Sequence, residues 1–154
     1  MGVVNKIVLV IGMYCFAMIA VNAQTTLNLY PLNGTIGVRF FSEKKISLEP
    51  RVDFQFDHAD GQSNLFINTE LFTLINFSRE ERFNFYTGVG LGANIYNQAS
   101  SSFSGTLPLG ARYYINDSKR IAIIGECGMK VTALDFVKIK SYALIGVQIR
   151  FKKS

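Results

Sequence analysis

Residues 83–96 have the sequence FNFYTGVGLGANIY, and their character alternates from one position to the next. The odd positions, from Phe83 to Ile95, carry apolar side chains or threonine, while the even positions carry Asn, Tyr and Gly. Successive side chains of a β-strand point to opposite faces, so this period of two predicts a strand with one apolar face. Gly88-x-Gly90-x-x-Ala93 also fits the spacing of a dinucleotide-binding loop, but such a loop has to end a strand and open a helix. Since the alternation continues to Tyr96, the glycines are predicted to lie within the strand.

The same alternation recurs along most of the chain, and no segment after Gln24 has sustained helical periodicity. Seven strands are clear, at about 34–41, 45–57, 64–77, 82–96, 103–115, 119–132 and 138–151. Thr25–Leu32 is a candidate eighth strand, because Asn33-Gly34 after it is a tight hairpin signal. One long first strand from Thr26 to Phe41, giving seven in all, is the alternative.

The predicted connections fall into two kinds that alternate along the chain. Residues 42–44, 78–81 and 116–118 are short and polar, whereas 57–63, 97–102 and 133–137 are longer. An antiparallel up-and-down meander produces this alternation, because successive turns lie at opposite ends of the sheet. No linker divides the strands, and 154 residues correspond to one domain.

Residues 1–23 are predicted to be a secretory signal peptide. Lys6 provides the positive start, Ile7–Val21 is almost wholly apolar, and Val21-Asn22-Ala23 fits a cleavage site. The apolar run of about 15 residues is shorter than the roughly 20 that a membrane-spanning helix needs. The mature chain would be residues 24–154, with Cys127 as its single cysteine and therefore no internal disulfide.

Charge is distributed unequally between the two faces of the predicted strands. The overall formal charge is +5, but no basic run stands out, so nucleic-acid binding has little support. The apolar faces of the seven clear strands carry no charged residue. The opposite faces carry nine charged residues, namely Arg39, Glu49, Arg51, Asp53, Glu70, Arg112, Glu126, Lys130 and Arg150.

A soluble barrel points its apolar face inward, whereas a membrane barrel points it at lipid and keeps a polar interior. Two features favour lipid outside. Aromatic residues occur on the apolar face near the short turns, at Phe40, Phe77, Phe83, Tyr113 and Phe151, as in an interfacial girdle. The polar face is also rich in glycine, which suits a crowded interior. Because a sheet in lipid cannot keep an open edge, we predict an all-β, eight-stranded antiparallel up-and-down transmembrane barrel.

Three segments carry a resemblance to a known family: Phe85–Gly92 with its alternating glycines, Leu109–Tyr114, and the ending Gly146–Phe151. Together with the exported start, they resemble the small outer-membrane β-barrel proteins of Gram-negative bacteria. The resemblance implies location in the outer membrane, with outer-membrane lipid and the barrel-assembly machinery as partners. It also implies that Phe151 is the terminal aromatic read as an assembly signal, although Lys152-Lys153-Ser154 follow it.

The resemblance further implies a structural, surface-display or binding role without catalysis, cofactor or metal, for an unknown surface partner. The nine charged residues then have two interpretations: pairs that fill the interior, or a narrow porin-like passage for ions or small solutes. Arg112 and Lys130 are candidate neighbours of Glu126. A lipid-modifying enzyme built on His58, Asp60 and Ser63, and a soluble periplasmic barrel binding an apolar ligand, are further alternatives.

Overall fold

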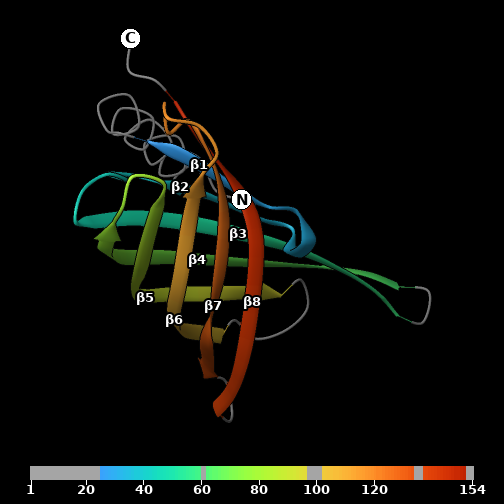
Figure 1. Ribbon diagram of the computed structural model, residues 1–154. Helices are drawn as coiled ribbons and strands as arrows, with labels where there is room; N and C mark the ends of the chain where they lie inside the picture. Colours follow the sequence, from blue (N-terminus) through green and yellow to red (C-terminus); the bar gives the residue numbers. More distant parts are fainter. Residues whose placement is uncertain (1–24, 60–61, 97–101, 134–136, 152–154) are drawn as a thin grey trace, which may run out of the picture.

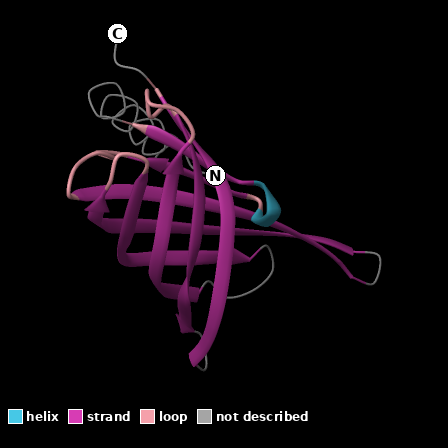
Figure 2. Cartoon of the chain, viewed as in Figure 1, coloured by secondary structure: helices cyan, strands magenta, loops and turns pink. Residues whose placement is uncertain are grey.

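A computed structural model describes residues 25–59, 62–96, 102–133 and 137–151, and the predicted signal peptide, residues 1–23, lies outside them. The regular secondary structure of the described residues consists of strands and one short 3₁₀ segment (Figures 1 and 2). The elements in chain order are β1 (Thr26–Tyr30), η1 (Pro31–Asn33), β2 (Thr35–Arg39), β3 (Ile46–Ala59), β4 (Gln62–Arg79), β5 (Phe83–Tyr96), β6 (Ser102–Tyr114), β7 (Ile121–Ala133) and β8 (Val137–Arg150).

The strands close into a barrel in which each strand pairs antiparallel with the next, and β8 pairs with β1. The predicted eight-stranded up-and-down barrel is confirmed. The seven-strand alternative is wrong, because the 3₁₀ turn Pro31–Asn33 and Gly34, whose φ is 65°, separate β1 from β2. A Cβ at Gly34 would also meet the carbonyl oxygen of Phe54, so both the backbone conformation and the close approach favour glycine.

The barrel has two different ends. We call the end with Thr25 and Phe151 the terminal end, and the end with the β1–β2, β3–β4, β5–β6 and β7–β8 connections the loop end. β1 and β2 have five residues each, whereas the other strands have 13 to 18. At about 3.3 Å per residue the first hairpin is only about 16 Å long, so the barrel is shorter at β1 and β2 than around the rest of its circumference.

The low β1–β2 hairpin leaves two long strands without neighbours near the loop end. Strand pairing ends at Leu29↔Val147 on the β8 side and at Thr35↔Asp53 on the β3 side. Within the described residues, β8 ahead of Val147 and β3 beyond Phe54 therefore face no strand across this gap, which we call the notch. Figure 1 shows the β3–β4 hairpin projecting past the β1–β2 turn.

Two sequence-based expectations about connections and faces are wrong. The expected longer loop at 57–63 is mostly strand, because β3 and β4 continue to pair as far as Ala59↔Gln62. Phe40 is 5% exposed and does not belong to an exposed aromatic girdle. β2 ends at Arg39 and Phe41 has a φ of 55°, so the alternation of faces stops before Phe40.

The glycines of the inner face fit closely against their neighbours. A Cβ at Gly90 would meet the ring of Phe72, and a Cβ at Gly110 would meet the ring of Tyr86. Gly105, on the outer face, has no atom within 4 Å of such a Cβ. Small residues are therefore required where large side chains fill the barrel. Among the described segments, no helix has the length and apolar character needed to cross a membrane.

Candidate functional site

The interior of the barrel holds the charged residues that the sequence places on the inner face. Six of the nine are buried, with 9% exposure or less: Arg39, Glu49, Arg51, Glu70, Arg112 and Glu126. Asp53, Lys130 and Arg150 lie at alternating positions of the same inner faces and are half-buried. Charge is costly to bury without partners, so the contacts of these side chains decide what the interior can do.

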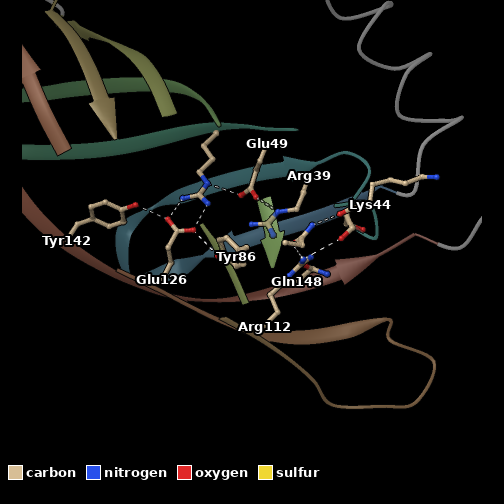
Figure 3. Close-up of polar contacts among 11 residues, drawn as sticks. Arg39, Lys44, Glu49, Tyr86, Arg112, Glu126, Tyr142 and Gln148 are labelled. Carbon is tan, nitrogen blue, oxygen red and sulfur yellow. Dashed lines mark hydrogen bonds and ion pairs between the residues drawn. The ribbon is translucent and has the colours of Figure 1, made fainter. Parts of the chain in front are cut away.

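A chain of ion pairs crosses the interior in the terminal half of the barrel (Figure 3). The carboxylate of Glu49 accepts hydrogen bonds from Arg39 Nε at 2.5 Å and from Arg51 Nε at 2.8 Å. Both terminal nitrogens of Arg51 donate hydrogen bonds to Glu126, one to each carboxylate oxygen and each at 2.6 Å. Since β3 and β7 are not neighbours in the barrel, the bidentate Arg51–Glu126 pair spans the lumen.

Tyrosine hydroxyls complete the coordination of Glu126. Tyr86 donates to Oε2 at 2.8 Å and Tyr142 donates to Oε1 at 3.0 Å, so this carboxylate accepts four hydrogen bonds. Aromatic faces also cover the guanidinium groups. Arg51 lies 4.2 Å from the ring centre of Phe72, and Arg39 lies 4.2 Å from that of Tyr86. We call Arg39, Glu49, Arg51, Glu126, Tyr86 and Tyr142 the plug.

Arg112 does not contact Glu126, as the sequence suggested it could, because Arg51 and the tyrosines occupy all the carboxylate positions. Its terminal nitrogens donate instead to Asn76 Oδ1 at 2.6 Å and to Gln148 Oε1 at 3.3 Å. Arg112 is fully buried and has no carboxylate partner among the described residues. Neutral amides therefore hold this guanidinium below the plug, near the terminal end.

The interior is less polar than the sequence suggested. A cluster of buried Tyr30, Phe72, Leu74, Tyr86 and Ile124, with Leu144 packed against it, shares the lumen with the ion pairs. These residues occupy inner-face positions of their strands, and the period of two could have identified them. The period of two places these side chains on the inner face, but nothing in the sequence shows which of them pack beside Glu49 and Glu126.

A cavity of about 490 Å³ lies above the plug, in the loop half of the barrel. Its lining residues come from both walls and include Asp53, Glu70, Thr106, Lys130, Thr132, Lys138, Lys140 and Tyr142. Lys130 Nζ lies 3.2 Å from Glu70 Oε1, which also accepts a hydrogen bond from Thr106 at 2.7 Å. Asp53 accepts a hydrogen bond from Asn68 at 2.7 Å. We call this cavity the cup.

The ends of the barrel hold the remaining predicted positions. Arg150 forms an ion pair with Glu43 at 2.7 Å, and the backbone N–H of Phe151 donates to Thr25 at 3.3 Å. The side chain of Phe151 is exposed.

Outside the strands, the hydrogen bond to Tyr113 and the charge of Asp117 hold the pKa of Arg82 above its ordinary value.

The parts of the proposed lipid-modifying site are only partly described. His58 and Ser63 are paired across the β3–β4 hairpin by their backbones, and Asp60 lies outside the described residues. Within the described parts of the chain, no group of three or more His, Cys, Asp or Glu side chains could hold a metal ion. The candidate site is therefore the interior, with its plug and cup.

Comparison of the chain with protein-family models, with curated proteins and with solved structures finds no match.

Proposed function

We propose that the protein is a small outer-membrane β-barrel with a closed lumen, acting as a structural, surface-display or binding protein without catalysis. One observation carries the proposal: large apolar side chains cover the outside of the barrel while charged side chains fill the inside. Outward residues of β5 to β8 are among the most exposed, including Leu91, Phe103, Leu107, Ile139 and Ile145 at 60–75% exposure. A water-soluble monomer rarely exposes a continuous apolar surface of this kind, whereas a lipid bilayer stabilises it.

Aromatic side chains support the same assignment. Phe77, Phe83, Phe85 and Tyr113 form a row of ring contacts on the outer face near the terminal end, with centroid distances of 4.9–6.3 Å. Aromatic residues concentrate where a barrel meets the membrane–water interface. The predicted signal peptide, residues 1–23, supplies the export that an outer-membrane location requires.

The plug favours a closed lumen over a passage. Arg51 and Glu126 meet across the lumen, and aromatic rings pack against the guanidinium groups on both sides of Glu49. An eight-stranded barrel leaves an interior just wide enough for side chains. A conducting path would have to break several charge-assisted hydrogen bonds at once, so we expect the wild-type protein to be silent in a planar bilayer.

Fractionation and gel mobility test the proposal together. The protein should sediment with the outer membrane and resist carbonate extraction. Unboiled samples should also migrate differently from boiled ones in SDS gels, because a closed barrel resists cold SDS. Recovery in the soluble periplasmic fraction with no heat-dependent shift would contradict the proposal and favour a soluble barrel instead.

A further inference from the structure

The cup has an uneven distribution of charge. Three of its lining residues are lysines on the adjacent strands β7 and β8, namely Lys130, Lys138 and Lys140. Its acidic lining residues, Asp53 and Glu70, are on β3 and β4. The cup therefore has a basic wall on β7 and β8 and a wall with two carboxylates on β3 and β4, where the lining residue Arg51 is already paired with Glu49 and Glu126.

The basic wall places like charges opposite each other. Lys130 and Lys140 are direct partners in the β7–β8 register, and Lys138 precedes Lys140 by two residues, on the same face of β8. Like charges directly opposite on neighbouring strands destabilise a sheet. Glu70 reaches Lys130, but none of the ion pairs in the described segments involves Lys140.

Both carboxylates of the β3–β4 wall already have partners. Glu70 accepts hydrogen bonds from Thr106 and Ser104 besides its contact with Lys130, and Asp53 accepts one from Asn68. Asn68 lies on β4, beside Asp53 on β3, whereas Ser104 and Thr106 lie on β6 and Lys130 lies across the cup on β7. Because these carboxylates already have partners, an anion that enters the cup would meet Lys140, with Lys130 directly opposite it on β7, as its strongest charge partner.

We propose that the cup binds a phosphate-bearing anion, with Lys130 and Lys140 as its main charge partners. A phosphate monoester is small and carries close to two negative charges, so it would offset the repulsion between the paired lysines. Lysine binds phosphate as a point charge and needs no planar geometry. The volume of about 490 Å³ leaves room for an attached polar group such as glycerol or a sugar, next to the hydroxyls of Thr106 and Thr132.

The anion has two routes into the cup, which correspond to two sources. The cup lies on the loop side of the short β1–β2 hairpin, whose Asn33 and Thr35 are among its lining residues. A soluble phosphate ester could enter at the loop end, and a phospholipid headgroup could enter over the notch between β3 and β8. Both sources present phosphate oxygens to the same lysines, with close to two negative charges on a soluble monoester and one on a phospholipid diester.

Calorimetric titration of the purified protein in uncharged detergent micelles tests the proposal, with glycerol 3-phosphate as the probe and glycerol as the neutral control. Glycerol 3-phosphate should bind and glycerol should not. Lys140→Gln should weaken binding about tenfold, the effect of losing one charge-assisted contact. Glu70→Gln should tighten it about threefold, because it releases Lys130 from its carboxylate partner. Lys45→Gln, an exposed lysine at the terminal end, is the matched control and should bind as wild type.

Opposite effects of Lys140→Gln and Glu70→Gln would support the proposal, since general damage to the fold would weaken binding in both variants. Absence of binding, or equal binding by wild type and Lys140→Gln, would overturn it. Adding phosphatidylglycerol to the micelles then separates the sources. Loss of glycerol 3-phosphate binding would indicate a lipid headgroup, and unchanged binding would indicate a soluble ester.

The inference adds a ligand to the proposed membrane barrel, but the titration does not depend on where the protein resides in the cell. A protein that binds glycerol 3-phosphate through Lys140 and yet is found in the soluble fraction would contradict the proposed function alone. A membrane-embedded protein that binds no phosphate would contradict the inference alone.

Discussion

The inner face of the barrel holds buried ion pairs, whereas the outer face exposes large apolar side chains. On the inner face, Arg51 and Glu126 are buried and joined by two hydrogen bonds of 2.6 Å. On the outer face, Leu91 is 72% exposed. The difference teaches that a period-two sequence does not by itself say which face is the core. Charge pairing inside and uncharged apolar surface outside decide it.

The largest expected effect comes from removing a charge on the inner face. Glu126→Gln keeps the size of the side chain but leaves Arg51 buried with one carboxylate partner fewer. Breaking a buried ion pair on one side costs about 3–5 kcal/mol. We expect a loss of that size in the free energy of unfolding, measured by urea titration of the protein folded in lipid vesicles. A loss below about 1 kcal/mol would show that the plug contributes little to stability.

Adding a charge on the outer face should be almost as costly. Leu91 lies near the middle of β5 and points outward. If the outer face contacts lipid, Leu91→Lys should lower the free energy of unfolding in vesicles by about 2–4 kcal/mol. If this surface faced water, the same substitution would be close to neutral, so the variant separates the two environments directly.

A methyl group distinguishes the two faces on a smaller scale. In Gly110→Ala the added Cβ would press on the ring of Tyr86, which is fixed by its hydrogen bond to Glu126. Overpacking of this kind costs about 1–3 kcal/mol. Gly125→Ala is the matched control on the outer face, where no atom lies within 4 Å of the new Cβ. The same urea titration should give a lower free energy of unfolding for the first variant than for the second; equal values would contradict close packing inside.

The smallest effect is expected at an ion pair outside the sheet. Arg82 and Asp117 are 2.9 Å apart, but their side chains are 53% and 88% exposed. Solvent screens such a pair, so Asp117→Asn should leave the melting temperature unchanged within error. A clear destabilisation would mean that exposed pairs contribute as the buried ones do, and the contrast with Glu126→Gln would lose its meaning.

The alternation of residues predicted the strands and the two faces, except at Phe40 and at the extended tip of the β3–β4 hairpin. It works because a sheet has a fixed period of two, so Glu49, Arg51 and Asp53 necessarily share a face. The eighth strand was also predictable, since Asn33-Gly34 marked the turn that separates β1 from β2.

Partner choice inside the barrel was beyond the sequence. Arg51 and Glu126 are 75 residues apart on strands that are not neighbours, so their meeting depends on barrel closure and on the register of all the strands between them. The prediction that Arg112 could reach Glu126 used only the neighbouring strand and missed this contact across the lumen. The short β1–β2 hairpin and the notch beside it could not be predicted either, because they depend on where strand pairing stops in three dimensions.

The most direct test of the outer face uses the native thiol. Cys127 points outward on β7, between Leu109 and Ala143 of the neighbouring strands, and is the single cysteine after residue 23. A nitroxide attached there, in protein reconstituted into vesicles, reports collisions with oxygen, which concentrates in lipid, and with a water-soluble nickel chelate. We predict that oxygen relaxes the label more strongly than the chelate does. Stronger relaxation by the chelate would place the outer face in water and contradict the assignment of inside and outside.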